Sequence, residues 1–436
     1  MRFEQLKLDY YDLPLSRPWI IPRTDNRKSF LLQLQPKLEP SSTKYDVSLG
    51  GWMQARLNDN VVLVNEMKLN YASQNDSSYI GREWRSISGT TNQSYLLWNR
   101  QIGKTGGMIF QAGRFYRQLG PGRHGQLLAG SNHRPIDQLS ISLAKSFSKN
   151  AYIKFYFQTS ALDKIGTDNR FMSLHRLEMK GGNWYFAVSE AMTYARKNQG
   201  QDAVYLNPFM IYHFEQLNGP GLSGNTIGTI DFGIKWKTSH LYSEILVDDV
   251  QFDNEVKGDL EPNELGGLVG YEFAGQNFYL SVEGVTITNR TYKTPDLAEW
   301  FVHRNEPIGY ELGSDLGRVN VLTRYYLKEN WHLDATIDMI WRGEGELSHP
   351  WDTPWMEEAV TLQDGYSEPF PTGVVEKSAI LSVEVMRHWD RERWLGLGIS
   401  YRDISNLNHV LNSDRSEFNL HLNASWSLEF EAIFDD

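Results

Sequence analysis

The feature that most constrains the fold is an unbroken alternation of apolar and polar side chains over residues 418–430. The apolar positions are Phe418, Leu420, Leu422, Ala424, Trp426, Leu428 and Phe430. The positions between them carry amides, hydroxyls, a histidine and a glutamate. Because successive side chains of a β-strand point to opposite faces, this run predicts a strand with one apolar and one polar face.

The length and polarity of this run indicate a membrane strand. Tilted strands of about 10 residues cross a bilayer, and barrel strands place apolar side chains toward lipid and polar ones toward the lumen. No apolar run in the 436 residues reaches the roughly 18 residues that a transmembrane helix needs. We therefore interpret residues 418–430 as a closing strand of an outer-membrane-type barrel.

Similar period-2 runs recur about 18 times along the chain, an even number as expected for bacterial barrels. They lie near residues 29–38, 43–57, 60–73, 93–103, 107–117, 138–147, 150–160, 170–181, 183–196, 224–237, 239–251, 264–274, 277–288, 317–328, 331–343, 375–388, 393–404 and 416–430. The sequence thus predicts an all-β, transmembrane, antiparallel up-and-down β-barrel.

The connections between these runs alternate in length. Short turns such as residues 58–60 and 148–149 are followed by long segments such as 74–92, 118–137, 197–223, 289–316 and 344–374. Barrels of this class have short periplasmic turns and long extracellular loops, whereas a soluble sandwich with Greek-key crossovers would not keep this parity.

The chain divides into three predicted parts. Residues 1–28 contain Pro14, Pro18 and Pro22 and form a periplasmic lead-in too broken for a long helix or a central strand. Residues 29–431 form the barrel, and residues 432–436 form a tail. No apolar signal-peptide core follows Met1, so the sequence is mature, truncated or cytosolic, and a barrel requires one of the first two.

Charge and motif content narrow the function. The net charge of −11 argues against a nucleic-acid partner, and the absence of cysteine excludes disulfides and thiolate metal sites. Residues 120–125 match GxGxxG, but no helix pattern follows, which favours a sharp loop turn. The acids Asp248, Asp249, Asp253, Asp259 and Glu261 lack calcium-loop spacing and are interpreted as a solvated rim. We expect no cofactor and no catalytic site.

Polar positions of the strands predict a charge network in the lumen. It combines the acids Glu66, Asp231, Glu283, Asp334 and Asp338 with Arg56, Lys154, Arg318 and Arg324. One residue breaks the pattern: Glu190 falls on the same side as Trp184, Phe186 and Val188. A bulge or a position near the rim would accommodate it.

Aromatic residues in two long connections suggest a binding surface, because aromatic faces beside acids and amides suit sugar rings. Loop packing at the barrel mouth would use the same residues. The candidate polysaccharide-binding residues are Trp300, Tyr310, Trp351, Trp355, Arg114, Arg304 and Asp315.

A set of short motifs resembles the capsule-assembly Wzi family, in order, over most of residues 43–346. The motifs are Gly113-Arg114, Leu119-Gly120-Pro121-Gly122 with Gly125, Leu127-Leu128 and Pro135, His175-Arg176-Leu177-Glu178, Ser189-Glu190-Ala191, Leu206-Asn207-Pro208-Phe209, Asp248-Asp249, Glu283 with Thr286, Pro307-Ile308-Gly309 with Gly313 and Asp315, and Arg342-Gly343-Glu344-Gly345. The resemblance implies an 18-stranded outer-membrane lectin that helps to hold capsular polysaccharide on the cell surface.

We therefore expect a non-enzymatic barrel in the outer membrane of a Gram-negative bacterium, in contact with lipid and with surface or capsular polysaccharide. One alternative is a diffusion channel for sugars or oligosaccharides, since lumens of mixed charge also describe porins. Another is a structural subunit docked to other envelope proteins through its loops. An envelope hydrolase is a further alternative, without a constellation of residues to support it. The sequence leaves the oligomeric state open.

Overall fold

The computed structural model describes residues 28–40, 45–71, 81–130, 133–148, 150–219, 223–252, 254–328, 330–389, 393–426 and 428–434. Residues 1–27 of the predicted lead-in (1–28) and the last two residues of the predicted tail lie outside these ranges. Within them, no helix has the length and apolar character needed to cross a membrane.

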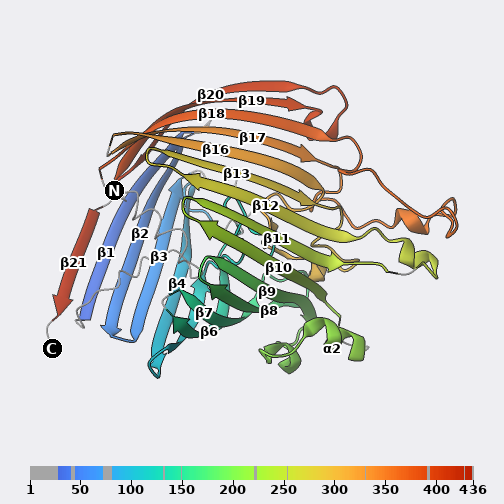
Figure 1. The fold of residues 1–436 in the computed structure, drawn as a ribbon, viewed down its shortest axis with the longest axis horizontal. Helices are drawn as coiled ribbons and strands as arrows, with labels where there is room; N and C mark the ends of the chain where they lie inside the picture. The colour runs from blue at the N-terminus through green and yellow to red at the C-terminus, as the bar shows by residue number, and fades with distance from the viewer. Residues whose placement is uncertain are drawn as a thin grey trace.

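Nineteen strands form one antiparallel sheet that curves into a barrel (Figure 1). They are β1 (Lys28–Pro40), β2 (Tyr45–Asn58), β3 (Val61–Tyr71), β4 (Ile87–Ile102), β5 (Gly106–Phe115), β6 (Ile136–Ser148), β7 (Ala151–Ala161), β8 (Asp168–Gly181), β9 (Trp184–Lys197), β10 (Asn225–Trp236), β11 (Ser239–Asp249), β12 (Glu264–Ala274), β13 (Phe278–Ile287), β16 (Leu316–Lys328), β17 (Trp331–Arg342), β18 (Glu376–His388), β19 (Trp394–Ser405), β20 (Arg415–Ser425) and β21 (Leu428–Phe434). The short strands β14 (Val302–His303) and β15 (Glu306–Pro307) pair with each other in a connection.

The strands follow one another around the wall in sequence order, and the ends of the chain close it. β1 pairs with β2 on one side and with β20 and β21 on the other. Since β20 and β21 share one edge of β1, the nineteen strands occupy eighteen positions (19 − 1 = 18). The prediction of an up-and-down barrel of about 18 strands is therefore confirmed.

The last predicted strand is divided in two. β20 ends at Ser425 and β21 begins at Leu428, where the sequence predicts one continuous strand. The register with β1 nevertheless continues, because Ser425 pairs with Lys37 and Leu428 with Leu34. Both segments thus complete the same part of the wall.

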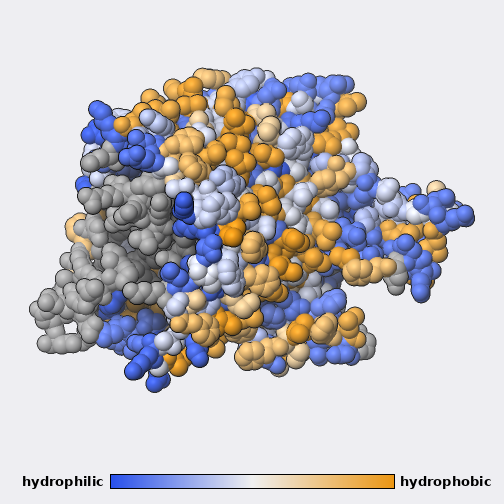
Figure 2. All heavy atoms as spheres, viewed as in Figure 1, coloured by the Kyte–Doolittle hydropathy of each residue, from blue (hydrophilic) through white to orange (hydrophobic). Residues whose placement is uncertain are grey.

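Side chains alternate across the wall as the sequence predicts. On β17, Trp331 and Ile337 are exposed on the outer face, whereas His332 and Asp338 are buried on the lumen side. On β8 to β11, the exposed residues Leu177, Val188, Ile230 and Ile245 are paired neighbours in one row around the outer face. We call this outward apolar surface the lipid belt. Figure 2 shows apolar side chains spread over the visible wall.

The lumen combines ion pairs with a hydrophobic core. Arg318 pairs with Asp338 at 2.7 Å and Arg324 with Asp334 at 2.6 Å, in agreement with the predicted charge network. Elsewhere the lumen is packed with apolar side chains from the wall and from two long connections. The fully buried members are Leu127, Leu128, Leu174, Ala191, Ile227, Leu246, Ile287, Tyr292, Phe301, Tyr310 and Leu316.

The two connections that supply this core join β5 to β6 and β13 to β16. They begin at the rim where long loops are expected, but their described central parts turn into the barrel. Their apolar residues, among them Leu127 and Phe301, pack against lumen-facing residues of the wall instead of meeting water. The lumen is therefore less polar than the alternation of the strands alone predicts.

Short helices occur only in the connections of the described chain. They are η2 (Ala203–Leu206), α2 (Tyr212–Asn218), η3 (Lys257–Leu260), η4 (Leu297–Glu299), η5 (Pro354–Met356) and η6 (Leu407–His409). The long connections extend at the end of the barrel that carries α2 (Figure 1).

Candidate functional site

Two wall carboxylates hold the β5–β6 connection inside the barrel. Glu244 of β11 accepts hydrogen bonds from the backbone N–H groups of Leu127 at 3.1 Å and Leu128 at 3.2 Å. Gly120 approaches the same carboxylate with φ of 129°, where a Cβ atom would lie 2.6 Å from Glu244 Oε2. Buried N–H groups need acceptors, so this carboxylate fixes the loop in the lumen.

The second carboxylate, Glu283 of β13, accepts from the backbone N–H groups of Arg123 at 2.6 Å and His124 at 3.1 Å. The motif at residues 120–125 is therefore a turn held between two strands. No helix occurs in the described part of the β5–β6 connection, in agreement with the interpretation as a loop.

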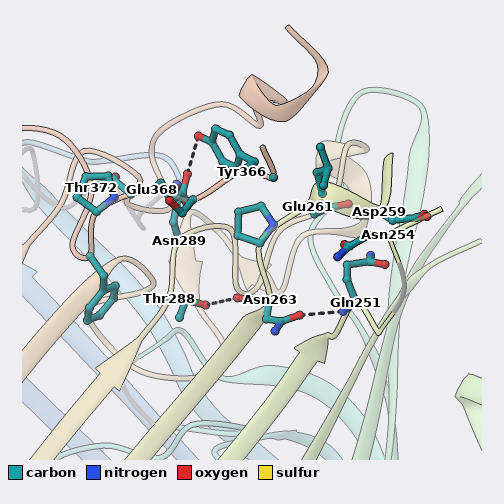
Figure 3. A pocket seen from close by; sticks show the side chains of 16 residues that line it. Gln251, Asn254, Asp259, Glu261, Asn263, Thr288, Asn289, Tyr366, Glu368 and Thr372 are labelled. Atoms are coloured by element: carbon teal, nitrogen blue, oxygen red, sulfur yellow. Dashed lines mark hydrogen bonds between the residues drawn. The ribbon is translucent and has the colours of Figure 1, made fainter. Parts of the chain in front are cut away.

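A polar cavity with a volume of about 440 Å³ lies among the connections that remain outside the lumen (Figure 3). Three segments line it: the β11–β12 connection, the residues that follow β13, and the β17–β18 connection. The lining residues are Gln251, Asn254, Asp259, Leu260, Glu261, Pro262, Asn263, Thr288, Asn289, Gly365, Tyr366, Ser367, Glu368, Pro369, Phe370 and Thr372. We call it the rim cavity.

Hydrogen bonds between the segments give the rim cavity a defined shape. The backbone N–H of Gln251 donates to Asn263 Oδ1 at 2.8 Å, and the Thr288 hydroxyl donates to the Asn263 carbonyl at 3.1 Å (Figure 3). The Tyr366 hydroxyl lies 3.3 Å from Glu368 and donates to it. The side chains that face the opening are thus positioned before any ligand arrives.

A buried arginine supports one wall of the rim cavity. Arg290 forms ion pairs with Glu368 and Asp352, each at 2.8 Å, and its guanidinium lies 4.8 Å from the centre of the Trp355 ring. A buried guanidinium without an ionic partner is costly, so Glu368 is held in place as a partner of Arg290. Asn289 also donates to Glu368, at 3.3 Å.

The rim cavity contains a carboxyl group that titrates near neutral pH. Burial, followed by repulsion from Asp249, raises the pKa of Glu261 to about 7, against a weaker attraction from Arg290. At neutral pH the carboxyl group of Glu261 is therefore protonated in part of the molecules, where it can donate a hydrogen bond, and ionised in the rest, where it only accepts. The cavity therefore offers amides, hydroxyls, carboxyl groups and two aromatic rings.

Three of the predicted site residues lie beside the rim cavity. The rings of Trp351 and Trp355 are 6.5 Å apart, and Trp355 lies 6.2 Å from Tyr366. Asp315 is fully buried and accepts from the backbone N–H groups of Gly345 at 2.8 Å and Thr372 at 3.0 Å. Of these three predicted residues, Trp351 keeps the most exposed surface, whereas Trp355 and Asp315 are buried.

The other two predicted aromatic residues do not line the rim cavity, and Tyr310 belongs to the core in the lumen. The indole N–H of Trp300 donates to the Thr294 carbonyl at 2.8 Å, and the Tyr310 hydroxyl accepts from Arg318 at 3.2 Å. Both side chains are buried. In this structure they can shape the surface above them but do not themselves reach a ligand in solvent.

The two predicted arginines lie together, apart from the residues that line the rim cavity. Arg114 pairs with Asp137 at 2.6 Å across β5 and β6. Burial, then repulsion from Arg114 and Arg134, lowers the pKa of Arg304. The three arginines form a basic group that Asp137 and Asp163 partly neutralise.

Sequence reasoning did not identify Gln251, Asn254, Asn263, Thr288 and Asn289 as site residues. Their signal is a high density of amides and hydroxyls in the β11–β12 connection and directly after β13. The neighbouring acids were interpreted as a solvated rim in preference to a calcium site. Asp259 is instead used locally, accepting from the backbone N–H groups of Glu255 and Val256. In the ranges that the structure covers, no group of three or more His, Cys, Asp or Glu residues is placed to hold a metal ion.

Comparison with solved structures identifies similar barrels. The outer-membrane protein Wzi of Escherichia coli, described as a carbohydrate-binding β-barrel involved in group 1 capsule assembly, superposes with a TM-score of 0.59 at 12% identity, covering 93% of this chain and 84% of that one. OccD3 (OpdP) of Pseudomonas aeruginosa gives a TM-score of 0.50 at 8% identity, covering 93% of each chain. These similarities support the barrel fold.

Comparison of the sequence with curated proteins finds no match. A family model described as capsule assembly protein Wzi matches residues 39–417. This match spans the barrel wall from the end of β1 into β20, together with the three segments that line the rim cavity. The chain therefore belongs to the Wzi family of capsule assembly proteins.

Proposed function

We propose that this outer-membrane barrel binds capsular or other surface polysaccharide at the rim cavity, as a lectin and without catalysis. The observation that carries the proposal is the preformed polar cavity among the outer connections, lined by amides, hydroxyls, carboxyl groups and aromatic rings. Family membership supports it, because the solved Wzi of Escherichia coli is described as carbohydrate-binding.

The chemistry of the lining matches a sugar ring. A sugar presents a fringe of hydroxyl groups that both donate and accept hydrogen bonds, and amides such as those of Gln251 and Asn254 do the same. Its C–H faces are apolar and suit the rings of Tyr366 and Phe370. The volume of about 440 Å³ accommodates a short saccharide segment while the rest of the polymer continues outside.

Within this proposal the sequence-predicted residues take different roles. Trp351 extends the aromatic surface next to the cavity, and Trp355 and Asp315 position the loops that carry Tyr366 and Thr372. Arg114 and Arg304 add a basic group for acidic sugars. The buried Trp300 and Tyr310 support the loops from beneath, Tyr310 as part of the core in the lumen.

Binding of purified protein to capsular oligosaccharides tests the proposal. Replacing Asn254 and Tyr366 together by alanine removes one amide and one ring from the cavity, and we expect a loss of affinity of about ten-fold or more, since each hydrogen bond or ring contact contributes about 1 kcal/mol. The matched control is Phe252→Ala, a highly exposed residue on the same connection that does not line the cavity. Equal loss in both variants, or no binding by the unmodified protein, contradicts the proposal.

A diffusion channel is the second candidate, favoured by the mixed-charge part of the lumen. The inward connections oppose it, because their core occupies the lumen between β6 and β16. Single-channel recording separates the two functions. A steady open conductance would favour the channel, and a closed barrel that still binds glycan would favour the lectin.

A further inference from the structure

The described part of the connection between β9 and β10 lies along the outer face of the wall. Phe209 stacks on Phe155 of β7, with ring centres 5.3 Å apart. Tyr212 of α2 lies 4.8 Å from the ring of His175 of β8. Phe155 and His175 alternate with the lumen-facing residues Tyr156 and Arg176, so they point outward. Figure 1 shows α2 outside the barrel near the ends of β8 to β10.

The inner surface of this segment is packed like a core. Met192 and Tyr194, which point outward from β9, are fully buried against Tyr205 of η2 and Tyr212 of α2. Elsewhere on the lipid belt, outward residues such as Val188 are exposed. Residues 198–219 thus cover a part of the wall that would otherwise face the membrane, and we call them the outer cover.

The outer cover also shields an ion pair that the lipid belt would not tolerate. Glu190 lies 3.2 Å from His175, one pair of residues above Val188 and Leu177. It accepts hydrogen bonds from the backbone N–H groups of Tyr212 and His213, each at 2.9 Å. A charged group facing acyl chains is costly unless it is paired and covered. The departure of Glu190 from the apolar pattern is explained by this contact, since the pairing of β9 with both neighbours has no bulge there.

The exposed face of α2 carries large apolar side chains together with His213 and Asn218. The polar residue Gln216 of the helix faces the wall, donating to the Gly224 carbonyl at 2.7 Å and accepting from the Thr226 hydroxyl at 2.6 Å. Its apolar residues Phe214 and Leu217 point away and are 59% and 73% exposed. Phe209 is 75% exposed, and Leu206 and Ile211 are also exposed. Figure 2 shows apolar atoms gathered at the lower right, where α2 lies.

We propose that the outer cover is immersed in the acyl chains of the outer leaflet and extends the lipid belt beyond the strands. The occupant of its exposed apolar face is membrane lipid, because Phe209 of the outer cover stacks on Phe155, which is paired with Leu177 of the lipid belt. Large apolar side chains on the outer surface of a segment that packs against a membrane barrel are favoured where the surroundings are apolar. This role goes beyond polysaccharide binding and separates this connection from those that line the rim cavity.

Site-directed spin labelling in lipid nanodiscs tests the proposal directly, because the chain contains no cysteine. Single-cysteine variants Phe214→Cys and Leu217→Cys report the outer cover, Ile245→Cys reports the lipid belt, and Phe252→Cys reports the aqueous loops. All four positions are exposed, so labelling does not disturb a core. We expect the labels at 214 and 217 to match the label at 245, with high accessibility to oxygen and loss of broadening by a water-soluble nickel chelate.

Two results would overturn the proposal. Nickel accessibility at 214 and 217 equal to that at 252 would place the outer cover in water. Dipolar broadening between labels on different molecules would show that a second copy of the chain, rather than lipid, covers the face. Glycan binding by the labelled variants is measured in parallel, and its outcome is independent of both.

Discussion

Buried carboxylates fix the connections of this barrel by accepting hydrogen bonds from loop backbones. Glu244 and Glu283 hold the β5–β6 connection in the lumen, Glu190 holds α2 on the outer face, and Asp315 holds residues on both sides of the β17–β18 connection. The two oxygens of a carboxyl group can accept several N–H groups at once. One acidic residue can therefore replace several apolar contacts.

Glu244→Ala should release the β5–β6 connection locally. It leaves the N–H groups of Leu127 and Leu128 buried without acceptors, at a cost of about 1–3 kcal/mol each. We expect amide hydrogen exchange at these two residues to become about ten- to a hundred-fold faster, measured by mass spectrometry in detergent. Glu358→Ala, at an exposed acid of the β17–β18 connection, is the control. Unchanged exchange at residues 127 and 128 would show that apolar packing alone holds the loop.

The carboxyl group of Glu261 should make stability depend on pH. Burial, and then Asp249, raises its pKa in the folded protein from 4.5 to about 7, so the folded state binds a proton more tightly than the unfolded state. The resulting stabilisation is present below about 4.5 and is lost as the pH rises through about 7. Glu261→Gln should remove this part of the slope. Thermal unfolding across that interval is the measurement, and an identical slope in the variant would refute the assignment.

At the scale of single elements, the period of the sequence predicted the strands because each strand meets lipid on one side. Membrane strands can be predicted from the local alternation of apolar and polar residues, without knowing which strands pair with each other. The connections carry no such signal. Leu127 and Tyr292 meet in the lumen although 165 positions separate them, joined by a hydrogen bond from the Tyr292 hydroxyl to the Leu127 carbonyl.

The candidate site was harder to predict for the same reason. The rim cavity combines amides from three connections, and amides in a loop are also typical of plain solvated surface. Trp300 and Tyr310 were expected to face sugars, but both are buried, and Tyr310 packs in the apolar core of the lumen. Trp351 and Trp355 lie beside the cavity because they belong to the β17–β18 connection. Asp315 lies there because it accepts a hydrogen bond from Thr372 of the same connection.

A charge on the lipid side of β17 should be far more harmful than one on the lumen side. Ile337 is 45% exposed on the lipid belt, and its neighbour Thr336 points to the lumen. We expect Ile337→Lys to destabilise the folded barrel in a bilayer by about 2–4 kcal/mol and Thr336→Lys by much less. Urea titration in lipid vesicles measures both. Equal costs would mean that the two faces of β17 meet similar surroundings.

For the molecule as a whole, shape and charge act together on the ligand. The wall presents apolar residues outward, the connections between β5 and β6 and between β13 and β16 fill part of the interior, and the rim cavity is left at the outer end. The net charge of −11 opposes the approach of an acidic polymer, whereas under the proposed function the basic group around Arg304 would attract it at short range.

Salt should therefore change the rate at which an acidic polysaccharide associates. Raising the ionic strength from about 0.01 M to 0.15 M shortens the screening length from about 30 Å to 8 Å, which weakens the repulsion from the whole molecule. We expect faster association with an acidic capsular oligosaccharide and no change with a neutral one, measured by surface plasmon resonance. Slower association of the acidic ligand at the higher salt concentration would show that the basic group dominates.

The pairing of β1 with β20 and β21 has a consequence for biogenesis. Lys37 and Ser425 become hydrogen-bonded neighbours although they are 388 positions apart (425 − 37), so the ring stays open until nearly the whole polypeptide has been delivered. Contacts this distant are slow to form, and until they do both unfinished edges offer free N–H and C=O groups to any other strand. Protection of the unfolded protein by chaperones is thus most needed until the final step, when the first and last strands of the barrel pair.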